Sequence, residues 1–388
     1  MLRRRSLLAF LPLAILCSGC SAPRRVAAES LPKEQATDLV PHSREANDVA
    51  RFLSGMPGTP GSPYAPLEAS DVWKEHRRIV DADWQQAERE QFPGLRKFQA
   101  DELSAPALES RTVFYPFSGP DSLTAALYFP HNPLYVMVAL EPAGTLPTPA
   151  QMAAKQTPAY LGAVRDSMAS ELGRSFFITR QMDRQFRGQV TDGLLVPILQ
   201  LLVRSGHSII GYRYVRLDET GQVIDRTAEY HASTRYGNKG VEVEFQNDAD
   251  SSVHHLLYFS VNLSNDRLRE NTPFQLYLSR LTGTVSMLKA TSYMPHHPGF
   301  SMIVDALLRD SAAILQDDSG LPFKKFAKDQ WKVQLYGDYN QPYGSFRWME
   351  QPDLREAYKT ESPKPLPMHV GYGYKRITSN LQLATRLP

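Results

Sequence analysis

The chain of 388 residues has few of the residues that cross-link or anchor a protein. Its only two cysteines are Cys17 and Cys20, both close to the N-terminus. A domain that begins after them therefore has no structural disulfide, thiolate metal site or cysteine nucleophile. Its stability must come from a packed core. A hydrophobic content of 42%, with 10% aromatics, is sufficient for such a core at this length.

An excess of charge of one sign is lacking too, and so are long apolar runs. The 43 basic and 41 acidic residues leave a net charge of +2, which gives no reason to expect a nucleic-acid partner. The most apolar stretch beyond the N-terminus, residues 194–203, is too short to span a bilayer and is interrupted by Pro197. We therefore expect neither nucleic-acid binding nor a membrane-spanning helix.

The N-terminus has the pattern of an export signal. Arginines occupy positions 3–5, and an apolar stretch follows at residues 7–16. This stretch is as long as a secretory signal requires and too short for a stable transmembrane helix. The small residues Ser18 and Gly19 stand directly before Cys20. The order of basic, apolar and small residues predicts a signal peptide over residues 1–19.

Gly19-Cys20 resembles the cleavage box of bacterial lipoproteins, in which the cysteine thiol is diacylated before the signal peptide is removed. The resemblance implies that Cys20 becomes the lipid-modified first residue of the mature protein. It departs from the family pattern at Cys17, where leucine is usual. Lipidation of Cys17 itself and an unmodified Cys20 thiol are the alternatives. The choice of export route also stays open, because Arg4-Arg5 fits a twin-arginine signal as well.

Residues 20–69 follow without periodicity and include a Pro/Gly-rich stretch, so we expect a flexible tether before a globular domain at residues 70–388. An aspartate directly after the lipidated cysteine would resemble an inner-membrane retention signal. This chain has Ser21 at that position, which favours the outer membrane. The sequence thus predicts a protein of the cell envelope, facing the periplasm. We expect the protein to contact the membrane through its lipid and to have an envelope protein or a glycan as its partner.

The domain mixes helical and strand patterns. A helix is expected from Ser70 to the Pro93-Gly94 pair, a short one before Phe129, and a further one marked by Leu161 and Leu172. Two more helices are expected at residues 274–293 and 300–315. Strands are expected at residues 112–117, 134–140, 241–245, 256–263, 331–336 and 369–374, with a hairpin at 209–224. We predict one compact α+β domain, with mixed α/β as the variant. Its central, partly antiparallel sheet is flanked by helices.

The first candidate site lies between Val113 and Glu141. A strand ends in Ser118-Gly119-Pro120-Asp121, a short helix follows, and a second strand ends before Glu141. A glycine directly after a strand, with an acidic residue about 20 positions later, is typical of a Rossmann-type nucleotide site. The segment resembles a reduced form of the first methyltransferase motif. It has a single glycine, and Pro120 removes a backbone N–H, so we favour a tight turn between packed strands.

Three shorter patterns are weaker candidates. Ser286-Met-Leu-Lys289 matches the S-x-x-K motif of penicillin-binding proteins, but the companion motifs of that family do not follow in order. The histidine pairs His254-His255 and His296-His297 are adjacent, so their side chains diverge and do not have the spacing of metal ligands.

The acidic pair Asp317-Asp318 precedes Ser319-Gly320 and suits either a turn or a polar site, and we favour the turn. We therefore predict no metal and no cofactor. Asp121, Glu141, Asp317, Asp318, His296 and His297 are the candidate polar site residues.

Three strings are similar to those of an uncharacterised group of exported bacterial proteins: Phe114-Tyr-Pro-Phe-Ser-Gly-Pro-Asp121, Ile314-Leu-Gln-Asp-Asp-Ser-Gly320 and Gly371-Tyr-Gly-Tyr374. This resemblance implies no activity. We expect a lipoprotein that binds a ligand or partner without catalysis. The alternative is a periplasmic hydrolase or carbohydrate-active enzyme that uses acidic or histidine residues from distant segments. An enzyme should bring those residues together in one pocket.

Overall fold

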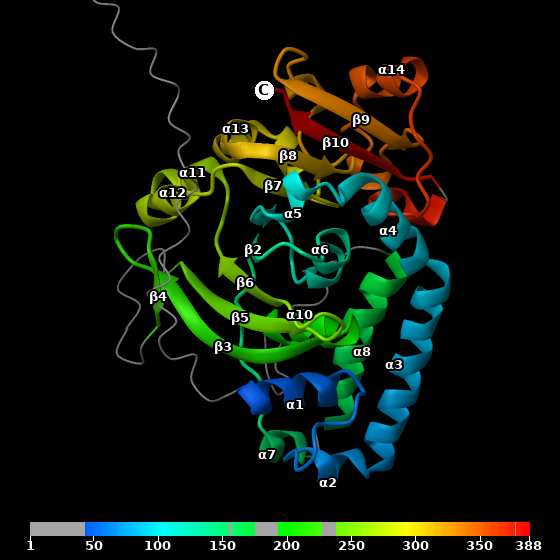
Figure 1. The fold of residues 1–388 in the computed structure, drawn as a ribbon, viewed down its shortest axis with the longest axis vertical. Coiled ribbons are helices and arrows are strands. Elements are labelled where there is room, and N and C mark those ends of the chain that lie inside the picture. Colours follow the sequence, from blue (N-terminus) through cyan, green and yellow to red (C-terminus); the bar gives the residue numbers. More distant parts are fainter. Residues whose placement is uncertain (1–42, 155–156, 175–192, 227–237, 377) are drawn as a thin grey trace, which may run out of the picture. The chain divides into compact units, whose positions relative to one another are not determined.

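The computed structural model describes residues 43–154, 157–174, 193–226, 238–376 and 378–388 (Figure 1). Cys17 and Cys20 lie outside these residues, so the predicted lipid attachment is not part of the described structure. A mixed sheet of ten strands runs through the described part, with helices on both faces. The predicted fold class, an α+β domain with a central, partly antiparallel sheet flanked by helices, is confirmed.

The strands lie across the sheet in the order β4-β3-β5-β6-β2-β1-β7-β8-β10-β9. Their bounds are β1 (Val113–Pro116), β2 (Leu134–Ala139), β3 (His207–Leu217), β4 (Val223–Asp225), β5 (Lys239–Asn247), β6 (Val253–Ser260), β7 (Thr284–Leu288), β8 (Ser311–Gln316), β9 (Trp331–Gly337) and β10 (Asn380–Arg386). The hairpin predicted at residues 209–224 is β3 and β4, whose turn is closed by the hydrogen bond from Gly221 N to Asp218 O.

The centre of the sheet is parallel. Strands β6, β2, β1, β7 and β8 pair in parallel, and β9 shares their direction because antiparallel β10 separates it from β8. Taken in chain order, these six strands lie in the sequence 3-2-1-4-5-6, which is the order of doubly wound nucleotide-binding sheets. Two features are added to that order: β10 is inserted antiparallel near one edge, and β3, β4 and β5 extend the other edge.

The α-helices of the described residues are mostly short. They are α1 (Ser43–Leu53), α2 (Ala65–Glu68), α3 (Asp71–Glu90), α4 (Phe92–Phe98), α5 (Pro106–Glu109), α6 (Ser122–Tyr128), α7 (Pro149–Met152), α8 (Thr157–Arg174), α10 (Leu195–Arg204), α11 (Asn265–Arg269), α12 (Thr272–Leu278), α13 (Ser301–Asp310) and α14 (Pro352–Thr360). As expected from the sequence, Ser70 caps α3 by accepting a hydrogen bond from the backbone N–H of Trp73. None of these helices is both long and apolar enough to cross a bilayer.

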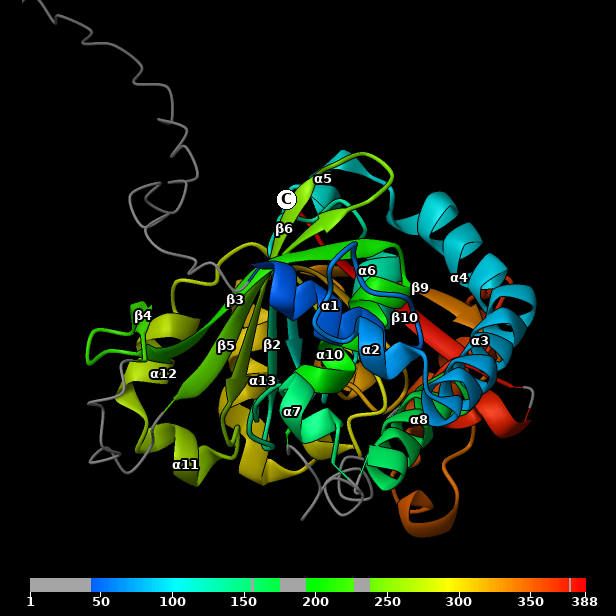
Figure 2. The same ribbon diagram turned by 90° about the horizontal axis from the view of Figure 1, so that it is seen from below.

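Two hydrophobic clusters cover the two faces of the sheet. One face packs against helices that include α1, α3, α4, α6, α8 and α10, and the other packs against α11, α12 and α13 (Figure 2). Strands β1 and β7 are buried along their whole length because both of their faces are covered. Fully buried parallel strands lose the polar alternation that marks a half-exposed strand in a sequence.

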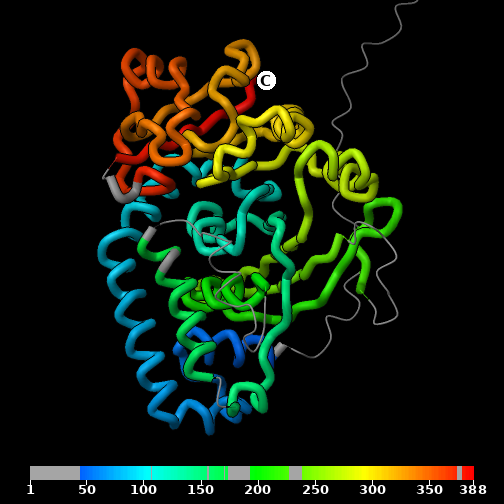
Figure 3. Tube along the Cα trace, turned by 180° about the vertical axis from the view of Figure 1, so that it is seen from behind, coloured from blue at the N-terminus to red at the C-terminus, as the bar shows by residue number. Residues whose placement is uncertain are grey.

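The domain begins earlier than the sequence indicates. The predicted tether at residues 20–69 includes α1, whose side chains at Ala46, Val49, Phe52 and Leu53 are buried in the core. Helix α1 packs against β3 and α10, far away in the chain, and Figure 3 shows it in blue beside the green α10. The packing corrects the expected boundary at residue 70, since the described fold starts at Ser43.

Three predicted elements in the second half were wrong. The helix expected at residues 274–293 is α12 followed by strand β7, and the helix expected at 300–315 is α13 followed by strand β8. The strand expected at 369–374 includes part of the 3-10 helix Gly371–Arg376, and the last strand is β10 instead. In the first two cases a buried strand without polar alternation extended the apolar pattern of the preceding helix.

Candidate functional site

A pocket opens at the carboxyl ends of four neighbouring parallel strands. Residues 117–119 and 121 line it after β1, 138–141 at the end of β2, 261–263 after β6 and 289–292 after β7. Its volume is about 160 Å³, which is ample for an organic ligand because one water needs only about 10–15 Å³ by this measure. In open α/β sheets, ligands bind outside the carboxyl ends of the strands, where the strand order reverses. That reversal lies between β1 and β7, inside this pocket.

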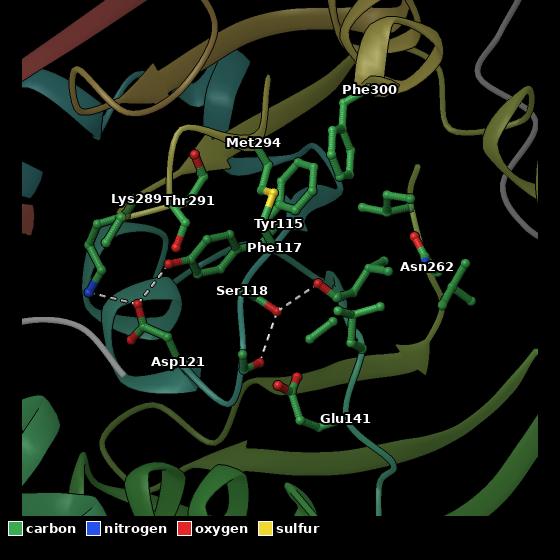
Figure 4. A pocket seen from close by; sticks show the side chains of 18 residues that line it. Tyr115, Phe117, Ser118, Asp121, Glu141, Asn262, Lys289, Thr291, Met294 and Phe300 are labelled. Carbon is green, nitrogen blue, oxygen red and sulfur yellow. Dashed lines mark hydrogen bonds and ion pairs between the residues drawn. The ribbon is translucent and has the colours of Figure 1, made fainter. Parts of the chain in front are cut away.

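The pocket has an apolar end and a polar end. Figure 4 shows Met294 and Phe300 at one end, and Asp121 and Glu141 at the other. The ring of Phe117 packs edge-on against Phe300, with 5.8 Å between ring centroids. A pocket of this kind suits a ligand that has a flat apolar group and hydrogen-bonding groups on different sides.

Asp121 is fixed by three partners at the polar end. It caps helix α6, because its Oδ1 accepts the backbone N–H of Thr124 at 3.0 Å. Its Oδ2 accepts the hydroxyl of Tyr115 at 2.8 Å and forms an ion pair with Lys289 Nζ at 2.7 Å (Figure 4). Asp121 is 1% exposed, so this carboxylate is a buried and fully engaged part of the pocket wall.

Lys289 follows β7 and joins the pocket to helix α8. Its Nζ lies 2.7 Å from Asp121 Oδ2, 3.1 Å from Glu171 Oε1 and 2.7 Å from the hydroxyl of Thr124. An ammonium group has three hydrogens, so these three acceptors use all of them. Burial alone would lower the pKa of Lys289, but the charges of Asp121 and Glu171 outweigh it, and the pKa is raised.

Glu171, the buried carboxyl group on the other side of Lys289, has a raised pKa. Burial and the neighbouring Asp121 raise its pKa to about 8, against the opposing charge of Lys289. Its second oxygen, Oε2, has no hydrogen-bond partner among the described residues, which leaves a place for a proton. At neutral pH the group therefore holds the Asp121–Lys289 ion pair beside a largely protonated Glu171.

Glu141 differs from Asp121 in having a carboxylate that is free to bind a ligand. It lies beyond the end of β2, is partly exposed and lines the pocket. Its backbone carbonyl accepts the hydroxyl of Tyr258, which fixes the backbone at this position. Among the described residues, no hydrogen bond or ion pair engages its side-chain oxygens, so Glu141 is the unpaired acceptor at the polar end.

The pocket rim holds strained backbone. Phe117 after β1, and Ala290, Ser292 and Tyr293 after β7, have φ angles between 50° and 60° without being glycine. This left-handed conformation costs roughly 1–2 kcal/mol per non-glycine residue. Ser292 is held there by its contacts with the hydroxyl of Tyr372, which accepts its backbone N–H at 3.0 Å. Strain of this kind persists where the surrounding structure fixes it, and it often accompanies a binding site.

Asp317 and Asp318 lie behind this rim, at the end of β8. Asp317 accepts the backbone N–H of Ser319 at 2.9 Å, as the predicted turn requires, and also that of Ala290 at 2.9 Å. Burial raises its pKa against these hydrogen bonds. Asp318 accepts the hydroxyl of Tyr293, and burial with the nearby Asp317 raises its pKa to about 7. Neither aspartate lines the pocket, so both support the turn after β7 from behind.

The histidine pairs do not enter the pocket. His296 is mostly buried, and burial lowers its pKa to about 4, while His297 is exposed. His254 and His255 lie on β6 near its amino end, where His254 Nδ1 contacts the backbone carbonyl of Asn132 at 2.9 Å. The described residues contain no group of histidine, cysteine and carboxylate side chains that could hold a metal ion.

The S-x-x-K pattern is accidental. Ser286 is fully buried within β7, and its hydroxyl lies 2.8 Å from that of Ser311 on the next strand. Strand alternation directs Ser286 and Lys289 to opposite faces of the sheet. The serine therefore lacks the neighbouring lysine that nucleophilic chemistry of this type needs.

Of the six candidate residues, the structure brings Asp121 and Glu141 together in one pocket, and Asp317 contacts its rim through Ala290. Asp318 and His296 form a neighbouring buried cluster, and His297 is outside it. Sequence reasoning missed Lys289 as a site residue, and also Glu171 and Tyr115. A lysine directly after an apolar run is a signal for Lys289, but the run was interpreted as part of a helix.

No family model matches the chain, and neither a curated protein nor a solved structure does. The geometry of the pocket is therefore the basis on which a function is inferred.

Proposed function

We propose that the protein is a lipid-anchored ligand-binding protein of the cell envelope, and that its pocket binds a nucleoside-type molecule. The observation that carries the proposal is the unpaired carboxylate of Glu141 at the carboxyl end of the second strand of a doubly wound sheet. An acidic residue at this place accepts hydrogen bonds from ribose hydroxyls in nucleotide-binding sheets of this order.

The first strand–helix–strand unit supports this proposal from the sequence side. The segment that resembles the first methyltransferase motif is β1, α6 and β2, with β1 and β2 parallel and adjacent. The tight turn expected there is present, and it forms one wall of the pocket. Gly119 has a φ of 55°, the left-handed conformation in which glycine has no steric penalty.

The apolar end offers a place for a base. Phe117, from the segment after β1, meets Met294 and Phe300, from the segment between β7 and α13, so a flat ring can pack against aromatic and thioether groups. A nucleoside joins such a ring to a sugar with two adjacent hydroxyls. A ring near Phe300 therefore has its sugar directed toward the polar end, where Glu141 lies.

Binding is favoured over the alternative of hydrolysis because the acidic residues are not arranged as a catalytic pair. Asp121 uses both oxygens to hold Thr124, Tyr115 and Lys289. Glu141 is then the remaining carboxylate in the pocket lining of the described residues. General acid–base hydrolysis by two carboxylates needs one protonated and one ionised group that both face the substrate.

Calorimetric titration of the purified full chain with adenosine tests the proposal. The detergent used must keep a lipid-modified N-terminus in solution. We expect saturable binding at one site, weakened at least about tenfold by Glu141→Gln, because a hydrogen bond to a charged group contributes about 1.5–3 kcal/mol. The matched control is Glu219→Gln in the exposed β3–β4 turn, which should bind as the parent does. Absence of adenosine binding, or equal loss in both variants, would refute a nucleoside site at Glu141.

The lipid anchor has its own test. Expression with labelled palmitate should label the parent chain and the Cys17→Ala variant, and leave Cys20→Ala unlabelled. The comparison separates the two cysteines that the signal leaves open. Labelling that persists in Cys20→Ala but disappears in Cys17→Ala would show that Cys17 carries the lipid. Labelling of all three chains would show that neither cysteine is required for it.

A further inference from the structure

The place where nucleotide-binding sheets hold phosphate is already occupied in this chain. In such sheets the phosphate lies at the start of the helix after the first strand, where free backbone N–H groups accept it. Here that helix is α6, and the carboxylate of Asp121 itself receives the backbone N–H of Thr124. Pro120 directly before it has no N–H to offer. A phosphate at this place would meet a carboxylate instead of free donors.

Among the described residues, the pocket wall offers no cation that is available to compensate. Lys289 is the single lysine or arginine among the described residues that line the pocket. Its three hydrogens are directed to Asp121, Glu171 and Thr124, and its side chain is 3% exposed. To bind a phosphate, Lys289 would have to leave two buried carboxyl groups, which would then lose their counter-charge.

Apart from Lys289, the described groups that carry charge in or directly behind the pocket wall are acidic. Glu141 and Asp121 line the pocket, and Glu171 and Asp317 lie immediately behind its wall. The ammonium group of Lys289 balances Asp121, and the raised pKa of Glu171 keeps that group largely protonated, so the unpaired carboxylate of Glu141 remains at the polar end. The field at the polar end is therefore negative, and it repels an anion that approaches Asp121.

From this arrangement we infer that the pocket takes a phosphate-free nucleoside and rejects the corresponding nucleotide, with Asp121 as the residue that determines this specificity. The inference rests on the proposed nucleoside site. When a ribose is held at Glu141, its 5′ substituent is directed toward the start of α6, because the phosphate occupies that place in sheets of this order. The neutral 5′ hydroxyl of a free nucleoside is not repelled there, whereas a doubly charged phosphate is.

Titration of the full chain with three matched ligands tests the inference. The ligands are adenosine, adenosine 5′-monophosphate and adenosine 5′-sulfamate, which has nearly the bulk of the monophosphate without its charge. We expect adenosine and the sulfamate to bind within about tenfold of each other, and the monophosphate to bind at least about tenfold more weakly than the sulfamate. Raising the salt concentration should narrow the difference between the two esters by screening.

Each other outcome overturns a separate statement. If none of the three ligands binds, the proposed nucleoside site itself fails. If adenosine binds and the monophosphate binds as tightly as the sulfamate, the nucleoside site stands and phosphate rejection fails. If the sulfamate is as weak as the monophosphate, the pocket discriminates by size, and the inferred role of the Asp121 charge is wrong.

The variant Asp121→Asn assigns the effect to one residue. Asparagine keeps an oxygen that can cap α6, but it removes the negative charge and weakens the hold on Lys289. The ratio of sulfamate to monophosphate affinity should fall at least about fivefold in this variant. Circular dichroism and a cooperative unfolding transition verify that the variant is folded, and the ligand series with the parent chain decides the question if it is not. An unchanged ratio in a folded variant would contradict the role of Asp121.

Discussion

Lys289 has the most consequential side chain in the site, because it balances buried carboxyl groups from two helices. It connects Asp121 at the start of α6 with Glu171 in α8. Removing one partner of a buried ion pair leaves a charge without compensation, which costs about 3–5 kcal/mol. We therefore expect Lys289→Met to lower the free energy of unfolding by about that amount in denaturant titrations.

Two variants verify that the loss comes from the buried charge. Lys359→Met replaces a lysine that is 64% exposed and should change stability by less than about 0.5 kcal/mol. The double variant Lys289→Met with Asp121→Asn removes both charges of the pair, so it should be more stable than Lys289→Met alone. A double variant that is no more stable than the single one would show that lost packing, and not charge, causes the effect.

Glu171 gives a prediction about pH. Its pKa of about 8 in the folded state exceeds the ordinary value of 4.5, so the folded chain binds more protons than the unfolded chain between these values. Its contribution to stability is therefore complete below pH 4.5 and is lost as the pH rises toward 8. Unfolding measured from pH 5 to 8 should show this fall in the parent chain.

The variant Glu171→Gln isolates that contribution because the other groups titrate in both chains. The stability difference, parent minus variant, should decrease with increasing pH by up to about 1.4 kcal/mol per pH unit. A difference that stays constant over this range would mean that Glu171 has an ordinary pKa in the folded chain.

At the scale of elements, the turn after β7 stores strain that glycine would relieve. Ala290 has a φ of 50°, a conformation that glycine adopts freely. Relief of roughly 1–2 kcal/mol of strain exceeds the greater unfolded-state entropy of glycine, about 0.4–1 kcal/mol. We expect Ala290→Gly to leave the melting temperature unchanged or raise it. Ala87→Gly, inside helix α3, should lower it, because glycine costs about 1 kcal/mol in a helix. If both variants lower the melting temperature by a similar amount, the backbone at Ala290 is not strained.

Helix α1 gives the second prediction at this scale. Phe52 is 1% exposed, stacks on Trp73 and packs at a tilt against Tyr64. If residues 43–69 belong to the domain, Phe52→Ala should destabilise it by about 3–5 kcal/mol, the usual cost of deleting a buried aromatic ring. The exposed neighbour Arg44→Ala is the comparison, with an effect below about 1 kcal/mol. A tether that stays outside the core would give no effect at Phe52.

The same scale shows what the sequence could predict. Half-exposed elements such as α3 and the β3–β4 hairpin were predicted correctly, because their polar and apolar residues alternate with a definite period. Strands β7 and β8 were missed because both of their faces are covered and no alternation remains. With β7 interpreted as helix, Lys289 had no defined position, and its partnership with Glu171 could not be inferred from a separation of 118 residues.

For the whole molecule, the order of the strands accounts for the position of the pocket. The chain reverses its winding between β1 and β7, so the loops after these strands separate and leave space above the sheet. Asp121 and Glu141 were identified from their spacing around Gly119, which is local in the sequence. Their different roles could not be identified in this way, since Asp121 is engaged only because β7 brings Lys289 next to it.

The most direct test of the whole account is a crystal structure of the chain with adenosine. The account predicts density in the pocket, with the ribose hydroxyls within hydrogen-bond distance of the Glu141 carboxylate and the base against Phe117 and Phe300. The Asp121–Lys289 ion pair should remain intact beside the 5′ hydroxyl. An empty pocket at saturating adenosine, or adenosine bound elsewhere on the molecule, would contradict the account.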